Sequence, residues 1–358
     1  MSIVVNGLWK QFGDTAAVAG VSLDVSEGEM LVLLGPSGCG KTTIMRCIAG
    51  LEVPESGSIE VSGETMFDAA AGVNVPTHLR NIGMVFQSYA IWPHMSVFEN
   101  VSFPLEMADR EPMEIDARVG EALRMVGLGH EAGRGASQLS GGQMQRVALA
   151  RSLVMRPRVL LFDEPLSNLD ARLRDRLRIQ LRELQTELNI TSIYVTHDQT
   201  EALALADSIA VMETGNILQQ GDPISVYNEP QSSRIAEFLG YTNVFAVRMV
   251  ERGAKRWRVT LDDNISIETA PARQDGSDLC LCIRPQDILI DLSTGDVVGL
   301  DGEITLASFM GVCMHYRVRV SSGRSWDVLA TEINPLLRRG TKVKLRVPPP
   351  RAMLVQIS

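Results

Sequence analysis

A glycine-rich stretch near the start of the chain has the residue types that hold phosphate groups. Residues 35–43 match the pattern G-x-x-x-x-G-K-[ST], and they follow the apolar run 30–34. Glycines let backbone N–H groups close around phosphate oxygens, and the N-terminus of a following helix adds about half a positive charge. Lys41 would reach the β- and γ-phosphates, and Thr42 would offer its hydroxyl to Mg²⁺. The expected phosphate contacts are Gly35, Pro36, Ser37, Gly38, Cys39, Gly40, Lys41, Thr42 and Thr43.

Two acidic residues end a second apolar run. Asp163 and Glu164 follow residues 159–162, Val-Leu-Leu-Phe. In open α/β sheets, ligands bind beyond the carboxyl ends of parallel strands. Asp163 would hold Mg²⁺, and Glu164 would orient or deprotonate an attacking water. Alone the pair could be two solvated acids at a strand end. Together with the phosphate loop, it predicts an enzyme that hydrolyses a nucleoside triphosphate with Mg²⁺, and the two motifs indicate nothing narrower.

A third segment narrows the class of enzyme. Residues 139–146 read Leu-Ser-Gly-Gly-Gln-Met-Gln-Arg, ahead of a helical run. Small residues at a helix N-terminus can form a second phosphate cradle, although Ser140 could also simply cap the helix. Here the chain resembles the ATP-binding subunits of ABC transporters, whose signature is Leu-Ser-Gly-Gly-Gln. The resemblance implies nucleotide contacts from Ser140, Gly141, Gly142 and Gln143.

Four more residues match motifs of that family. Phe12 stands where an aromatic ring stacks on adenine, and Gln87 where a glutamine contacts Mg²⁺ and the attacking water. His197 resembles the switch histidine that contacts the γ-phosphate, and Asp170 ends a loop, 167–170, that runs between subunits. Each residue also has a simpler interpretation. Phe12 could be a core aromatic and Gln87 an exposed glutamine at a strand end. His197 could be a structural histidine, and the loop 167–170 could cap the following helix. The resemblance implies catalysis by Glu164, His197, Gln87 and Lys41, and Mg²⁺ binding by Thr42, Gln87 and Asp163.

The elements that position these residues alternate between strands and helices. Continuous apolar runs are typical of strands that a parallel sheet buries on both faces. A helical stretch spans residues 171–188, so an α/β sheet with helices on both sides is predicted. The apolar runs lie at 30–34, 83–86, 159–162, 192–195 and 208–212. The resemblance makes this an α/β P-loop NTPase fold over residues 1–239, with a helical subdomain at about 88–155.

The pattern changes near Gly240. Short β-like runs separated by turn residues predict an all-β domain, with residues 229–240 as the linker. This part, 240–358, resembles the OB-like TOBE domain that follows the ATPase domain in maltose-, polyamine- and iron(III)-type importers. In that group the domain makes additional dimer contacts. The β-like runs are 246–250, 279–283, 304–306, 313–320 and 343–347.

Composition limits the partners. The 358 residues carry 34 Lys and Arg against 43 Asp and Glu, a net charge of −9, which argues against nucleic acid as a partner. An arginine-rich helix at 172–182 could contact nucleic acid, but its interleaved acids favour a solvated face with ion pairs. Five scattered cysteines favour a reducing compartment. No apolar run reaches the roughly 18 residues that span a bilayer.

In the family that the chain resembles, ATP lies between the phosphate loop of one subunit and the signature of the other. The resemblance, with one phosphate loop and one signature in this chain, therefore implies a head-to-tail homodimer with two composite ATP sites. The resemblance implies an ABC importer ATPase on the cytoplasmic face of the bacterial inner membrane. Its partners would be two integral membrane permease subunits and, indirectly, an extracytoplasmic solute-binding protein. The segment 88–100 either packs within the helical subdomain or forms the docking groove for the permease.

Residues 28–35 and 238–243 resemble the iron(III) and polyamine members of the family more than the sugar members. The expected cargo is therefore iron(III) or a polyamine, with a sugar or an organophosphate as alternatives. A soluble ABC ATPase of DNA repair or translation is the alternative function, but such proteins usually carry coiled-coil insertions or two cassettes. An unrelated P-loop kinase or GTPase would leave residues 139–146 unexplained.

Overall fold

The computed structural model describes residues 2–272, 278–293 and 299–357. The chain forms two compact units, Met1–Asn228 and Glu229–Ser358. The sequence pattern placed the change at Gly240. The expected linker contains a helix, α8 (Ser233–Phe238), whose Ala236 packs with Cys280 and Cys282 of the second unit. The division therefore precedes this helix.

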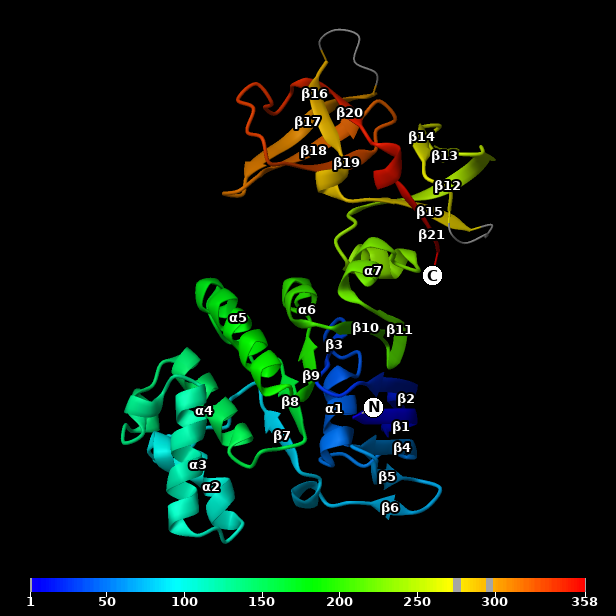
Figure 1. Ribbon diagram of the computed structural model, residues 1–358. Coiled ribbons are helices and arrows are strands. Elements are labelled where there is room, and N and C mark those ends of the chain that lie inside the picture. Colours follow the sequence, from blue (N-terminus) through cyan, green and yellow to red (C-terminus); the bar gives the residue numbers. More distant parts are fainter. Residues whose placement is uncertain (1, 273–277, 294–298, 358) are drawn as a thin grey trace. The chain divides into compact units, whose positions relative to one another are not determined.

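A six-stranded sheet forms the centre of the first unit (Figure 1). Its order is β11-β10-β3-β9-β8-β7; the pairs from β10 to β7 are parallel, and β11 is antiparallel. Every residue of β3, β8 and β9 is buried, which explains their continuous apolar runs. The predicted parallel sheet is confirmed. The strands are β3 (Met30–Leu34), β7 (Ile82–Val85), β8 (Val159–Asp163), β9 (Thr191–Thr196), β10 (Ser208–Glu213) and β11 (Asn216–Gly221).

A second, antiparallel sheet with the order β2-β1-β4-β5-β6 completes this core. One apolar cluster joins it to helix α1 (Lys41–Ala49) and to the parallel sheet, through side chains such as Val5, Ile44 and Leu33. The helix therefore lies against two sheets, which fixes the phosphate loop at its start. The strands are β1 (Ile3–Phe12), β2 (Thr15–Val25), β4 (Ser56–Val61), β5 (Glu64–Asp68) and β6 (Val73–Asn74).

Helices make up the rest of the first unit (Figure 1). Three of them, α2, α3 and α4, contact one another and form a helical subdomain. No helix in the described part of the chain is long and apolar enough to cross a membrane. The helices are α2 (Val97–Met107), α3 (Pro112–Met125), α4 (Gly141–Leu153), α5 (Ala171–Leu188), α6 (Gln199–Leu205), α7 (Pro223–Asn228), η1 (Thr77–Leu79), η2 (Gly129–Glu131) and η3 (Ala136–Gln138).

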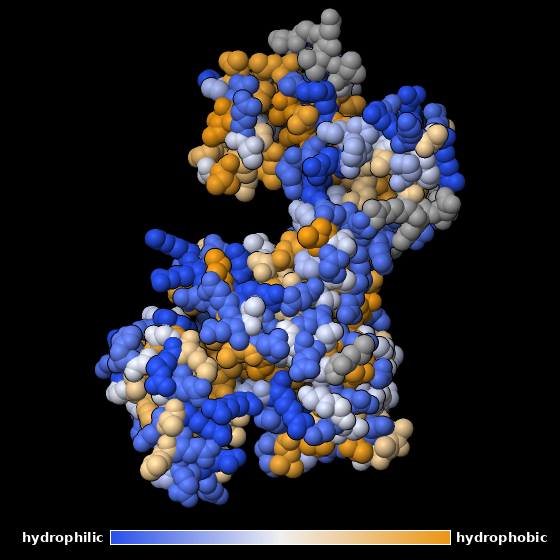
Figure 2. Space-filling model, viewed as in Figure 1, coloured by the Kyte–Doolittle hydropathy of each residue, from blue (hydrophilic) through white to orange (hydrophobic). Residues whose placement is uncertain are grey.

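The second unit is rich in strands, as expected. Two sheets, β14-β13-β12-β15-β21 and β16-β20-β17-β18-β19, share one apolar core that includes Trp326 and Tyr316. Figure 2 shows hydrophobic residues on its surface, and four large exposed ones lie on β17, β18 or their connection. They are Leu306, Phe309, Met310 and Val312. The elements are β12 (Asn243–Arg252), β13 (Trp257–Leu261), β14 (Ser266–Thr269), β15 (Leu279–Ile283), η4 (Pro285–Asp287), β16 (Leu289–Leu292), β17 (Leu300–Phe309), β18 (Met314–Val320), β19 (Ser325–Ala330), β20 (Lys342–Arg346), η5 (Pro349–Arg351) and β21 (Met353–Gln356).

A buried arginine ties the far end of α1 to the segment before β7. Arg80 is 1% exposed, and its guanidinium donates to the carbonyls of Cys47 and Ile48 at 2.8 Å. It also donates to the Val75 carbonyl at 2.8 Å and to Asn74 Oδ1 at 3.0 Å. Burial lowers the pKa of Arg80. The cation lies at the negative end of the helix dipole, where it bonds to the Ile48 carbonyl and adds a second donor to the Cys47 carbonyl, which also accepts from the Gly50 N–H.

We expect Arg80→Met to lower the free energy of unfolding of the first unit by about 3 kcal/mol, because it leaves buried carbonyls without donors. Arg156→Met is the matched control: its exposed ion pair with Glu121 is expected to contribute less than about 1 kcal/mol. Urea unfolding followed by circular dichroism measures both. Equal losses in the two variants would contradict the role given to Arg80.

Candidate active site

The phosphate loop ends in a helix whose first N–H groups have no side-chain cap. Gly40 is the N-cap of α1, with φ 104°, and no side chain bonds to the first turn. A Cβ atom on Gly40 would lie 2.1 Å from the Ala17 carbonyl oxygen of β2, so only glycine fits. In contrast, serine or aspartate side chains cap α2, α4, α5 and α6. The start of α1 is therefore suited to an anion that supplies the missing acceptors.

Lys41 folds back over this loop. It is 4% exposed, and its Nζ donates to the carbonyls of Gly35 and Pro36 at 2.8 Å. Its Nζ also lies 3.6 Å from Cys39 Sγ. The ammonium is thus held inside the loop by neutral acceptors, and phosphate oxygens in the loop would offer it charged ones, which bind more strongly.

Thr42 and Asp163 join the loop to the end of β8. Thr42 Oγ1 donates to Asp163 Oδ1 at 2.9 Å, and Asp163 is 6% exposed. Burial raises the pKa of Asp163, against the lowering effect of the Thr42 hydrogen bond. A hydroxyl and a buried carboxylate that lacks a full counter-charge are hard oxygen donors, which fit Mg²⁺.

Glu164 and His197, which the resemblance predicts to be catalytic, lie in contact with each other. His197 Nδ1 is 3.1 Å from Glu164 Oε2. The backbone of Glu164 is in the left-handed region, with φ 43°, although it is not a glycine. Such backbone strain costs of order 1–3 kcal/mol and persists where the surroundings fix the residue. Here the Glu164 N–H donates to the Val195 carbonyl of β9 at 3.1 Å.

Gln87 is linked to this pair through a serine that the sequence analysis did not single out. Gln87 Nε2 donates to Ser167 Oγ at 3.3 Å, and Ser167 Oγ donates to the Glu164 carbonyl at 2.9 Å. Asn168 Nδ2 also donates to the Gln87 carbonyl at 2.9 Å. The loop after β7 and the loop after β8 therefore hold each other beside Glu164.

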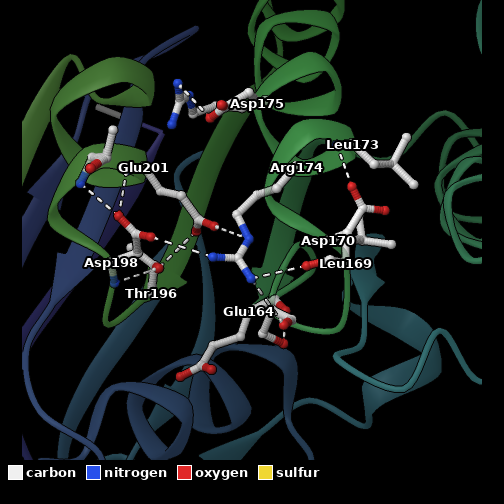
Figure 3. Close-up of polar contacts among 12 residues, drawn as sticks. Glu164, Leu169, Asp170, Leu173, Arg174, Asp175, Thr196, Asp198 and Glu201 are labelled. Atoms are coloured by element: carbon white, nitrogen blue, oxygen red, sulfur yellow. Dashed lines mark hydrogen bonds and ion pairs between the residues drawn. The ribbon is translucent and has the colours of Figure 1, made fainter. Parts of the chain in front are cut away.

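Figure 3 shows a polar network beside Glu164, between the start of α5 and the end of β9. Asp170 caps α5 by accepting from the Leu173 N–H at 3.0 Å. Arg174 points from α5 toward Asp198 and Glu201 (Figure 3). The sequence pattern favours a solvated helix face for Arg174, and it does not single out Glu201. The signal that could have identified them is their position: Arg174 stands four residues after Asp170, and Glu201 four residues after His197.

In the single chain, the signature residues lie at the start of α4, beside the start of α5. Ser140 and Gln143 form a reciprocal cap at the start of α4, and Gln143 Nε2 donates to Glu131 Oε1 at 3.3 Å. Ser140 is exposed. A Cβ atom on Gly142 would lie 3.0 Å from Leu173 Cδ2, so this glycine lets α4 approach α5 closely. Among the described residues, the hydrogen bonds of Ser140 and Gln143 do not include the phosphate loop.

Phe12 is half-exposed at the end of β1, next to the turn that leads into β2. Lys10 Nζ lies 5.1 Å from the centre of its ring. Ala17 of β2 contacts Gly40, so this hairpin lies beside the phosphate loop. The ring is exposed and available for stacking. Its alternative role, that of a core aromatic, would require it to be buried.

A groove of about 580 Å³ lies between the helical subdomain and the segment before β7. Within residues 88–100, Tyr89 is buried, as internal packing requires, whereas Trp92 lines the groove. Arg151 of α4 donates to the carbonyls of Tyr89 and Ala90 at 2.8 and 2.7 Å and lies over the Trp92 ring. Leu79, 64% exposed, adds an apolar wall.

Comparison with known proteins places this geometry in a family. The family model described as ABC transporter matches residues 18–167, and the one described as TOBE domain matches residues 281–355. A spermidine/putrescine import ATP-binding protein of Ruegeria pomeroyi is 43% identical over 320 residues, 89% of this chain and 85% of the relative. An Fe(3+) ions import ATP-binding protein of Rhizobium meliloti is 42% identical over 327 residues, covering 90% and 89%.

Two solved structures match the fold of this chain over a little less than two thirds of its length. A Clostridium perfringens protein that is part of an ABC transporter complex matches with a TM-score of 0.58 and 34% identity, covering 63% of this chain and 90% of that one. A dimeric ATP-binding cassette in a post-hydrolysis state, bound to ADP and phosphate, matches with a TM-score of 0.53 and 30% identity, covering 62% and 98%.

The Thr42–Asp163 contact gives a prediction about pH and metal. Because the pKa of Asp163 is raised, its ionisation opposes folding, and the stability it contributes falls as the pH rises above about 4. Asparagine cannot ionise but keeps an oxygen for Thr42. We expect nucleotide-free Asp163→Asn to be at least as stable as the wild type at pH 7, with a smaller loss of stability between acid and neutral pH.

The same variant is expected to lose Mg²⁺-dependent ATP hydrolysis by at least about 100-fold. Unfolding curves at several pH values and Mg²⁺ titrations of phosphate release measure the two effects. Asp24→Asn, at an exposed position of β2, is the control and should change neither. A destabilised Asp163→Asn that still responds to Mg²⁺ would contradict both parts.

Proposed function

This chain belongs to the ATP-binding subunits of ABC importers, which hydrolyse ATP to power solute uptake, and we propose how its residues divide that work. The observation that carries the proposal is the convergence of Lys41, Thr42, Asp163, Glu164 and His197 at one edge of the parallel sheet. A nucleotide whose phosphates enter the start of α1 would meet all five side chains.

In the proposed ATP complex, the N–H groups at the start of α1 and Lys41 bind the phosphates, and Phe12 stacks on adenine. Thr42, Asp163 and Gln87 would hold Mg²⁺, which would supply positive charge to neutralise the negative charge that develops on the phosphates. Lys41 would exchange the carbonyls of Gly35 and Pro36 for phosphate oxygens. This exchange replaces neutral acceptors by charged ones and favours the bound state.

Glu164 would accept the proton of the attacking water, and His197 would hold both Glu164 and the γ-phosphate. The 3.1 Å contact between them and the fixed backbone of Glu164 support this division. Gln87 would help to orient the water, because Ser167 connects its amide to the Glu164 carbonyl. General acid–base catalysis of this kind contributes typically 10²–10⁴-fold.

The second half of the site would come from another copy of the chain. We propose a head-to-tail homodimer in which Ser140, Gly141, Gly142 and Gln143 of one subunit meet the γ-phosphate held by the other. The exposed Ser140 and the dimeric structural relative support it. ATP would close the dimer, since it binds two surfaces only in that state, and hydrolysis would reopen it. The exposed residues Phe309, Met310 and Val312 would add contacts between the second units.

We expect Glu164→Gln to lower ATP turnover by at least about 100-fold, because an amide keeps the shape but cannot take the proton. With ATP and Mg²⁺ it should remain a dimer that the wild type forms only transiently. Phosphate release and size-exclusion chromatography measure the two results, with Glu187→Gln as an exposed control on α5. Wild-type turnover in Glu164→Gln would remove the role proposed for this residue.

We further propose that the groove lined by Leu79, Trp92 and Arg151 receives a cytoplasmic segment of a membrane permease subunit, two of which would bind the dimer. The chain would then act at the cytoplasmic face of the inner membrane, with a solute-binding protein on the other side. The relatives named for iron(III) and for spermidine/putrescine support one of these solutes as cargo. Both are cationic.

Purification of the full chain from detergent-solubilised host membranes tests this assembly. We expect integral membrane subunits to co-purify, and Leu79→Asp to reduce their recovery at least about tenfold by placing a charge in the groove. Met113→Asp, at an exposed position of α3, is the control.

The solute-binding protein encoded with those membrane subunits can then be titrated with iron(III), spermidine, putrescine and sugars. Binding of iron(III) or a polyamine supports the proposed cargo, and binding of a sugar alone contradicts it. Recovery of only soluble or nucleic-acid-associated partners would instead favour the soluble ABC ATPase.

A further inference from the structure

Arg174 bonds to the loop that follows Glu164. Its Nη2 donates to the Leu169 carbonyl at 3.1 Å and to the Ser167 carbonyl at 3.4 Å. The same loop carries the Ser167 hydroxyl, which bonds to the Glu164 carbonyl. Arg174 thus bonds to the backbone of the D-loop, residues 167–170, and Ser167 of that loop links it to the backbone carbonyl of Glu164.

The other side of the guanidinium faces the segment that carries His197. Arg174 Nη1 lies 3.7 Å from Asp198 Oδ2, and Nε lies 3.9 Å from Glu201 Oε1 (Figure 3). Glu201 is 3% exposed, and its Oε2 accepts from Thr196 Oγ1 at 2.8 Å. Because Thr196 precedes and Asp198 follows His197, these contacts restrain the backbone on both sides of the histidine.

We propose that Arg174 is a positioning residue for ATP hydrolysis: it holds the D-loop and the Thr196–Asp198 segment together and thereby keeps His197 against Glu164. The inference rests on the proposed catalytic roles of those two residues. Its distinguishing feature is that one planar cation serves two loops. Arginine can do this because its donors point in fixed and different directions.

The burial of Glu201 makes the Arg174 guanidinium costly to remove. Glu201 carries a carboxylate in an environment closed to water, with Tyr194 Oη and Thr196 Oγ1 donating to one of its oxygens. The other oxygen faces Arg174. Without the guanidinium, that carboxylate would lose its nearby positive charge, and the segment around His197 would rearrange to bring it to water. The expected effect is mainly on the geometry of the reacting groups, since the phosphate loop, Lys41 and Phe12, which are proposed to bind the rest of the nucleotide, are left unchanged.

The test compares Arg174→Met and Arg174→Lys with Arg182→Met in the full chain. Arg182 lies on the same helix, and its side chain, 32% exposed against 29% for Arg174, pairs with Asp207 at the surface, so it controls for loss of an arginine from α5. We expect both Arg174 variants to lower kcat by about 10- to 100-fold, as misplaced catalytic groups do, with KM for ATP changed less than about threefold. Lysine keeps the charge but cannot bond both loops. Arg182→Met should stay within about twofold of the wild type in kcat.

A double-mutant cycle with His197→Ala tests whether Arg174 acts through the histidine. We expect Arg174→Met to cause no further loss of single-turnover rate once His197 is absent. Multiplied losses, a wild-type kcat in either Arg174 variant, or an equal loss in Arg182→Met would overturn the proposal. If the wild type hydrolyses ATP and Glu164→Gln does not, such a result rejects only the role of Arg174. If Glu164→Gln hydrolyses ATP as fast as the wild type, the proposed function fails as well.

Discussion

The parallel pairing of β3, β9 and β8 is the constraint on which the rest of the structure depends. Parallel strands end at the same edge, so the phosphate loop after β3, Asp163 at the end of β8 and His197 after β9 meet without any long connection. The Thr42–Asp163 hydrogen bond then joins the first and the second of them. A carboxylate, a hydroxyl and a helix N-terminus are held within one small volume by backbone pairing and this one side-chain hydrogen bond, before any ligand binds.

The loops beyond that edge need a second layer of support, because backbone pairing stops where they begin. Ser167 and Asn168 hold the segment around Gln87, and Arg151 holds the two residues that follow, Tyr89 and Ala90. The supporting groups come from α4 and from the D-loop, which belong to different parts of the first unit. Movement of the helical subdomain on nucleotide binding would therefore act on Tyr89 and Ala90, close to Gln87 in the chain, and on the groove beside Trp92.

The sequence predicted the parallel strands and the phosphate loop well, because a strand buried on both faces is apolar at every position and the loop has a fixed spacing. It did not reveal the antiparallel sheet of β1, β2 and β4–β6, whose half-buried strands mix polar and apolar residues and contain register shifts. Nor did it separate Arg174 from its neighbours. One helix carries an arginine bonded inward and others paired at the surface, and only the packing of α5 decides which is which.

The unfavourable features of the first unit are concentrated where ATP is proposed to bind. Glu164 has a strained backbone, burial raises the pKa of Asp163, and the start of α1 lacks a side-chain cap. Each would be relieved or used by a nucleotide with its cation: phosphate oxygens accept from the free N–H groups, and a divalent charge favours the Asp163 carboxylate. Stability given up at this edge is therefore recovered on binding. An equilibrium between open and closed dimers can respond to ATP only if binding supplies such a difference in free energy between the two states.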